Sequence, residues 1–195
     1  MKKTADIKEH IIAVTTELIN QSNGNIAEIT TRLIADQAGI GIGLINYHFQ
    51  SKENLIEICV ERIINKVISA FAPPTQEQSP VLRLKHSAKL VFEFFVENPA
   101  VTRISILSDH KNPKQDDNTR RTITGICKGL GDDFDIPESK RHILAFTLVS
   151  VMQAMFLRKD QTEDFGGYDL TIKEQRDEVL DLLIDRIFAG FEDEK

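Results

Sequence analysis

The side chains best suited to bind an anion lie close together, between residues 30 and 52. Thr30 and Thr31 stand at the start of a predicted short helix, where hydroxyls, free backbone N–H groups and the positive end of the helix dipole favour a phosphate. Arg32 lies in the same first turn and can reach a phosphate or the edge of a base. Three further donors that can reach phosphate oxygens follow along the chain: Tyr47, His48 and Lys52.

A second short helix, predicted over residues 42–48, carries side chains suited to the edges of DNA bases. The amide of Asn46 can form two hydrogen bonds with adenine, and Ile42 or Leu44 can contact a thymine methyl group. Gly41 precedes this helix, and we expect the glycines of this segment to let one backbone approach another closely. These glycines are Gly39, Gly41 and Gly43.

Three helical elements must position these side chains. The helices predicted over residues 31–38 and 42–48 are too short to be stable alone, so each must pack on a neighbour. That neighbour is a helix predicted over residues 4–20, whose residues Ile11, Val14 and Leu18 recur on one face. Ser51 is expected to cap a longer helix that runs to about residue 71. The product is a helix-turn-helix that presents residues 42–48 outward.

Short motifs at fixed spacings accompany this arrangement. They are Ile34-Ala35, Ala38-Gly39-Ile40, Tyr47-His48-Phe49, Ser51-Lys52-Glu53 and Leu55, preceded by the helix around residues 11–18 and by Gly24. In this combination the first 55 residues resemble the tetracycline-repressor (TetR-type) family of bacterial transcription regulators. The resemblance implies a homodimer that binds a palindromic operator and releases it when a small ligand enters the C-terminal domain.

The predicted recognition helix departs from the pattern of that family. The family usually has small hydroxyl residues where Gly41 and Leu44 stand, and a tyrosine where Asn46 stands. Common polar contacts are therefore missing, and the contacts of Ile42, Leu44 and Asn46 with bases are hypotheses that rest on their chemistry alone.

The remaining chain also predicts helices, so the fold class is all-α. We divide it into a helix-turn-helix domain over residues 1–55 and a larger helical regulatory and dimerisation domain over residues 56–195. Helices are predicted over about 80–98, 99–107, 119–130 and 137–159. The last helix is expected to open at Thr171, whose spacing to Glu174 is that of a capping box, and to run to about Phe191.

Two C-terminal helices carry more apolar surface than a small domain easily covers. Residues 143–157 are apolar on nearly all sides, and the last helix carries an apolar stripe. A dimer interface formed as a four-helix bundle would cover both, and the alternative is a monomer that buries them in its own core. The predicted interface residues are Leu148, Val151, Leu180, Leu183, Ile184 and Ile187.

Phenylalanine and methionine side chains in the C-terminal domain could line an apolar pocket for a small effector. The alternative is that they are ordinary core residues. They are Phe92, Phe94, Phe95, Met152, Met155 and Phe156. No residue marks a charged ligand, a metal site or a cofactor, so the effector is expected to be an apolar small molecule, and no cofactor is expected.

Composition and charge limit the functions that this chain can have. The chain has 24 basic and 30 acidic residues, a net charge of −6, and an isoelectric point near 5.4. Binding to double-stranded DNA must therefore depend on a local arrangement of side chains and helix ends rather than on bulk charge. Residues 143–157 are too few to cross a bilayer, which needs about 20 apolar residues. Two cysteines indicate no disulfide framework, so a cytoplasmic protein without a membrane partner is expected.

The sequence thus predicts a ligand-responsive, homodimeric DNA-binding regulator, and most simply a repressor. The main alternative is a helical interaction or scaffold protein that no longer binds DNA, which the acidic charge and the apolar recognition helix favour. An enzyme is the weakest interpretation, because the sequence offers no nucleophile–base pair, no paired catalytic carboxylates and no metal-ligand set.

Overall fold

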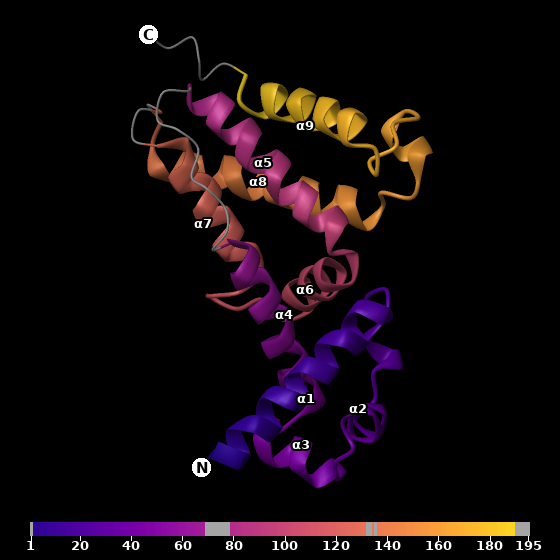
Figure 1. Cartoon of the computed structure of the whole chain (residues 1–195). Coiled ribbons are helices and arrows are strands. Elements are labelled where there is room, and N and C mark those ends of the chain that lie inside the picture. Colours follow the sequence, from indigo (N-terminus) through magenta and orange to yellow (C-terminus); the bar gives the residue numbers. More distant parts are fainter. Residues whose placement is uncertain (1, 69–78, 132–133, 135, 190–195) are drawn as a thin grey trace. The chain divides into compact units, whose positions relative to one another are not determined.

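The computed structural model describes residues 2–68, 79–131, 134 and 136–189 (Figure 1). Every regular element within these ranges is helical, which confirms the all-α prediction. The described chain divides into two compact units. The first lies within Met1–Phe71 and Asn98–Asn112, and the second within Ala72–Glu97 and Pro113–Lys195.

The first unit contains the three helices of the predicted helix-turn-helix and three further helical elements, η1, α4 and α6. Its 3₁₀ helix η1 follows α1, and α6 joins it from a later part of the chain (Figure 1). The first unit therefore extends beyond the domain predicted for residues 1–55, and that boundary stays a prediction. Its elements are α1 (Lys2–Gln21), η1 (Ile26–Glu28), α2 (Thr31–Ala38), α3 (Ile42–Phe49), α4 (Lys52–Ile68) and α6 (Pro99–Lys111).

The core of the first unit explains why two short helices are stable. Helices α2 and α3 have only eight residues each, and both dock through fully buried side chains. Ile34 of α2 and Ile45 of α3 are 0% exposed, and they belong to the same core as Ile11 of α1 and Leu55 of α4. Burial of one such side chain stabilises the fold by about 1.5–3 kcal/mol.

Local signals fix the ends of the short helices. The Thr30 hydroxyl accepts a hydrogen bond from the Leu33 N–H at 3.1 Å and caps α2, and Gly39 ends it at φ +64°. The Ser51 hydroxyl accepts a hydrogen bond from the Asn54 N–H at 3.1 Å, so the predicted cap of α4 is confirmed. Gly39 therefore begins the turn between α2 and α3, and Ser51 begins α4.

Gly24 fits the turn after α1 closely against α6. Its φ is +82°, and a Cβ atom there would lie 2.9 Å from the Cβ of Arg103. Only glycine satisfies both the backbone conformation and this contact. Helix α6 also ends later than predicted, at Lys111, so His110 lies on a helix and not in a loop.

The second unit is a group of helices with a phenylalanine- and leucine-rich core. Phe92, Phe156 and Leu180 are 0% exposed in it. Its elements are α5 (Pro80–Glu97), α7 (Asn118–Leu130), α8 (Glu138–Leu157), η2 (Thr162–Phe165) and α9 (Lys173–Ile187).

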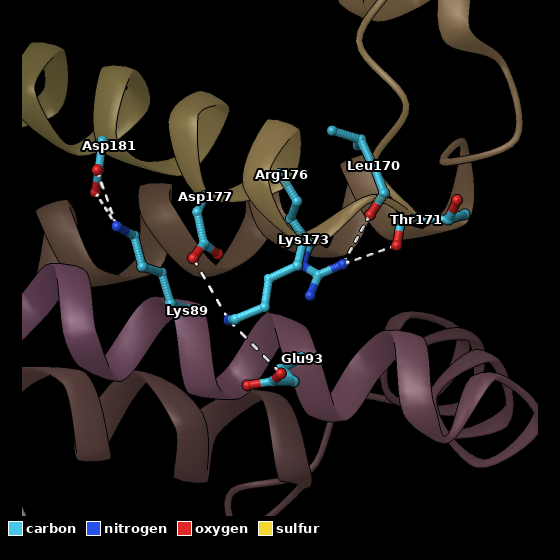
Figure 2. Close-up of polar contacts among 8 residues, drawn as sticks. All are labelled: Lys89, Glu93, Leu170, Thr171, Lys173, Arg176, Asp177 and Asp181. Atoms are coloured by element: carbon cyan, nitrogen blue, oxygen red, sulfur yellow. Dashed lines mark hydrogen bonds and ion pairs between the residues drawn. The ribbon is translucent and has the colours of Figure 1, made fainter.

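Ion pairs connect α5 with the antiparallel α9. Lys89 contacts Asp181 at 2.9 Å, and Lys173 contacts Glu93 at 3.6 Å (Figure 2). Pairs of this kind fix the register of two helices more than they stabilise them, because partly exposed pairs contribute about 1 kcal/mol or less.

The start of α9 differs from the prediction. The helix begins at Lys173 with no side-chain cap, so the predicted capping box at Thr171 is wrong. The Thr171 hydroxyl instead donates to the carboxylate of Asp169 at 2.7 Å. The guanidinium of the buried Arg176 donates to the carbonyl oxygens of Leu170 and Thr171 and closes the turn (Figure 2). The predicted end at Phe191 lies outside the described residues.

Candidate nucleic-acid interface

Helix α3 divides into a buried face and an exposed face. Ile45 and Phe49, four residues apart, are 0% and 1% exposed and attach the helix to the first unit. Ile42, at the first position of the helix, is 45% exposed, and Tyr47, on the other side, is 77% exposed. Large apolar and aromatic side chains that stay in water on so short a helix mark a contact surface.

The remaining predicted residues of α3 lie on or beside that surface. Asn46 is exposed and Leu44 is 36% exposed, although two residues apart on a helix they point in nearly opposite directions. His48 is half-buried and stands edge-on to the Tyr47 ring, with 5.0 Å between the ring centroids. Every side chain predicted on this helix thus keeps some exposed surface, His48 is the least exposed of them, and their contacts with DNA stay a prediction.

The start of α2 also faces solvent. Thr30 is exposed and Thr31 is half-buried, and the Thr30 hydroxyl is engaged as the helix cap. The side chain of Arg32 is 83% exposed, and its Nε atom lies 3.8 Å from a carboxylate oxygen of Asp36. An ion pair this exposed contributes little, so the guanidinium can exchange Asp36 for a phosphate at small cost.

Lys52 has a more fixed position than the sequence suggested. Its Nζ donates to the backbone carbonyl of Ile26 at 3.3 Å and lies 3.9 Å from a Glu53 carboxylate oxygen. Its side chain is only 20% exposed. Lys52 therefore ties the start of α4 to η1, and a contact of Lys52 with phosphate stays a prediction.

The glycines of the turn do not bring backbone close to backbone within the protein. A Cβ atom added at Gly41 or Gly43 would have no atom within 4 Å, so that expectation is wrong. Gly39 is required for its positive φ, not for close packing. The open space at Gly41 leaves the start of α3 accessible from outside the protein.

Two residues of α1 at this surface were missed by the sequence analysis. The ammonium of Lys8 lies 5.7 Å from the centroid of the Phe49 ring, so Lys8 adds a positive charge beside α3. The Nε2 atom of His10 lies 3.2 Å from the carbonyl oxygen of Ala38 at the end of α2. Only the packing of α1 on α2 and α3 creates these contacts, and no local motif signals them.

The predicted pocket residues come from α5 and α8 and cluster in the core of the second unit. The rings of Phe92 and Phe95 lie 5.7 Å apart, and Phe95 lies 5.7 Å from Phe156. Met152 and Met155 are also buried, whereas Phe94 is only half-buried. This packing matches the core alternative as well as a pocket, so the assignment stays a prediction.

The predicted dimer residues fall into two groups. Leu148, Leu180 and Ile184 are 0% exposed within the single chain, so their side chains serve its own core. Val151, Leu183 and Ile187 are half-buried. The most exposed apolar residues of α8 and α9 are not among the predicted interface residues. They are Ile143, Phe146 and Leu182, which are 65%, 58% and 59% exposed.

Other kinds of site find no support in the described residues. They hold no group of three or more histidine, cysteine or acidic side chains that could bind a metal ion. No helix among them is long and apolar enough to cross a membrane. The class of protein that this arrangement defines is a helix-turn-helix protein with an attached helical unit.

Comparison with known proteins finds one family model that matches the N-terminal part of the chain. Residues 11–59, which span α2 and α3, match the family described as bacterial regulatory proteins, tetR family. Residues 11–59 therefore carry a helix-turn-helix similar to that of TetR-family regulators.

Curated relatives share about a quarter of their residues with this chain. It is 27% identical over 169 residues to the nucleoid occlusion factor SlmA of Actinobacillus pleuropneumoniae serotype 5b, covering 80% of this chain and 82% of the relative. It is 27% identical over 184 residues to SlmA of Aliivibrio fischeri strain MJ11, covering 83% and 91%. The match to SlmA of Glaesserella parasuis serovar 5, at 25% identity, covers 66% of this chain and 63% of that relative.

Solved structures support the fold over nearly the whole chain. A TetR transcriptional regulator from Rhodococcus sp. RHA1 aligns with a TM-score of 0.64 over 97% of this chain and 98% of that one, at 14% identity. A tetR-family regulator from Streptomyces coelicolor aligns with a TM-score of 0.59 over 95% and 80%, at 16% identity. At such identities the likeness concerns the fold alone.

Proposed function

We propose that this chain acts in the cytoplasm as a homodimeric repressor that binds a palindromic operator through α3. The observation that carries the proposal is the two-faced α3, which buries Ile45 and Phe49 and leaves Ile42, Leu44 and Tyr47 in water. An α-helix fits the major groove of B-DNA, and its exposed side chains then lie against the edges of the bases.

The contact residues divide by chemistry. We assign base contacts to Asn46, which can pair with adenine, and to Ile42 and Leu44, which can contact thymine methyl groups. We assign backbone contacts to the polar residues that border α3 and to the exposed start of the helix. These are Thr30, Thr31, Arg32, Gly41, Tyr47, His48 and Lys52.

Dimer formation is proposed to use the second unit. Ile143 and Phe146 are three residues apart on α8 and both are more than half exposed, which supplies an apolar face for a second copy. The half-buried Val151, Leu183 and Ile187 are the predicted interface residues that still have surface to contribute. A twofold dimer would place two α3 helices in successive major grooves, about 34–36 Å apart.

Ligand response is proposed to begin at the aromatic cluster of the second unit. An apolar effector that inserts among Phe92, Phe95 and Phe156 would have to separate rings that now contact one another. Such a change can weaken DNA binding only by the difference in ligand affinity between the two states, typically about 1–3 kcal/mol.

Selection of DNA from a random pool by the full-length protein tests the proposal. We expect inverted half-sites with centres about 10–10.5 base pairs apart, bound by two chains. Asn46→Ala should lose about 1–3 kcal/mol of discrimination at one position of each half-site. Asn20→Ala, an equivalent change at an exposed position of α1, is the matched control and should bind like the wild type.

The proposal fails if the pool yields no enriched sequence, or if Asn46→Ala and Asn20→Ala bind alike. A selected site bound by a single chain would refute the dimer while leaving the role of α3 intact. Recovery of no sequence, with affinity independent of salt, would favour the scaffold alternative, because any contact with DNA phosphates makes binding salt-dependent.

A role in nucleoid occlusion is the second candidate. The curated relatives are named nucleoid occlusion factors, and two of them align over 80% or more of this chain. A strain that lacks the gene distinguishes the two functions. Division septa that form over nucleoids would support nucleoid occlusion, whereas altered transcription beside the selected sites with normal septum placement would support the repressor.

A further inference from the structure

Cys127 of α7 and His142 of α8 form a pair that the DNA-binding function does not use. The thiol Sγ lies 3.8 Å from the imidazole Nδ1, within hydrogen-bond distance for sulfur. Cys127 is half-buried and His142 is exposed, so a small molecule can reach the pair from solvent.

Arg141 holds the two helices in the position that creates this pair. Its Nη1 donates to the carbonyl oxygen of Gly131 at 3.0 Å, just beyond the end of α7. Its Nε and Nη2 donate to the carbonyl oxygen of Ile136 at 3.3 Å. The first turn of α8 is therefore tied to the end of α7, and His142 keeps its place beside the thiol.

The second cysteine provides a contrast within the same chain. Cys59 is 0% exposed, its Sγ lies 3.6 Å from the carbonyl oxygen of Ile12, and burial raises its pKa to about 11. Burial also raises the pKa of Cys127, and Glu138 adds to the rise while Arg141 opposes it. At neutral pH the Cys127 thiol is therefore protonated, and it requires a base to react.

We propose that Cys127 and His142 form a reactive-thiol site for α,β-unsaturated carbonyl compounds. His142 Nδ1 accepts the thiol proton, and the thiolate forms a bond from Sγ to the β-carbon of the compound. The π electrons of the carbon–carbon double bond move to the α-carbon, which takes the proton back from His142. The product is a thioether, and the reaction consumes no oxidant or reductant.

N-Ethylmaleimide, a compound of this class, tests the site on the full-length native protein by intact-mass and peptide mass spectrometry. We expect one adduct at neutral pH, on Cys127, with Cys59 unmodified. Cys127→Ser should leave the native chain unlabelled. His142→Gln should slow labelling about tenfold or more, because the thiol loses its base. His86→Gln, at an exposed histidine of α5, is the matched control and should label like the wild type.

A pH series separates the role of a base from a merely structural role of His142. The wild-type and His142→Gln rates should differ most at neutral pH and converge in alkali, where hydroxide removes the thiol proton without help. Equal rates for the two proteins at neutral pH would overturn the proposal. So would labelling of Cys59 before Cys127, or a rate difference that stays constant at every pH.

Discussion

Neighbouring residues of α3 allow stability and DNA binding to be separated. Ile45 is 0% exposed in the core of the first unit, whereas its neighbour Leu44 is 36% exposed. Truncation of each to alanine removes a similar amount of side chain. The two variants should nevertheless fail in different assays, because only one of the side chains is needed to hold the helix in place.

Ile45→Ala should lower the free energy of unfolding. Truncation of a fully buried isoleucine destabilises a protein by about 2–5 kcal/mol, since the lost contacts leave a cavity. Leu44→Ala should change the free energy of unfolding by no more than about 0.5 kcal/mol, as is usual for exposed positions. Urea denaturation followed by circular dichroism measures both values.

Leu44→Ala should lower the affinity for the operator. If Leu44 contacts a thymine methyl, the truncation removes apolar contact worth about 1–2 kcal/mol, which is roughly a 5- to 30-fold loss of operator affinity. Fluorescence anisotropy with the selected operator measures this loss of affinity, at a temperature at which both variants are folded. The reasoning is refuted if Leu44→Ala destabilises the fold as much as Ile45→Ala does, or if it binds the operator like the wild type.

Four further substitutions test the structure of the first unit. Gly24→Ala should lower stability by more than about 1 kcal/mol because of the positive φ at this position and the contact with α6. Gly43→Ala, in open space within α3, should raise stability by about 0.5–1 kcal/mol. Thermal unfolding of both variants measures the two changes. The hydrogen bond from Arg62 lowers the pKa of Glu9 below its ordinary value of 4.5, so the stability that this pair adds is present above pH 4.5 and is lost as the pH falls through the lowered pKa. The melting temperature of Glu9→Gln should therefore fall less steeply in acid than that of the wild type. Parallel curves for the two proteins would contradict this. Lys52→Met removes the bond to the η1 carbonyl and should cost about 0.5–1.5 kcal/mol in urea denaturation; an unchanged salt dependence of operator binding would show that Lys52 makes no phosphate contact.

Signals that are local in sequence predicted the helix-turn-helix well. The bounds predicted for α2 match the structure, because Thr30 and Gly39 determine its two ends through short-range hydrogen bonds and backbone conformation. The end of α6 was missed because its last turn is polar and exposed, and composition alone does not separate such a turn from a loop. The capping box predicted for α9 is absent because Thr171 bonds to Asp169, a competition that spacing does not reveal.

Contacts between distant segments could not be predicted in the same way. The position of Lys8 beside Phe49 depends on how α1 packs, and nothing near residue 8 indicates it. The apolar stripe of α9 predicted that Leu180 and Ile184 would be covered, but a stripe has the same appearance whether its own chain or a second chain covers it. Only the exposed fractions of individual side chains separate the two cases.

The acidic composition and the apolar surface of α3 have a common consequence for how this protein would select its DNA. A protein attracted to phosphates by many basic residues binds all sequences appreciably, and that binding weakens steeply as salt rises. Helix α3 carries no lysine or arginine, and the basic side chains described above for the candidate interface are Lys8, Arg32 and the partly buried Lys52. Few phosphate contacts mean weak binding to random sequences. Contacts of Ile42, Leu44 and Asn46 with bases would then supply a larger share of the total affinity, and apolar and hydrogen-bonded contacts are lost with the wrong base. A low positive charge therefore favours selectivity over general affinity.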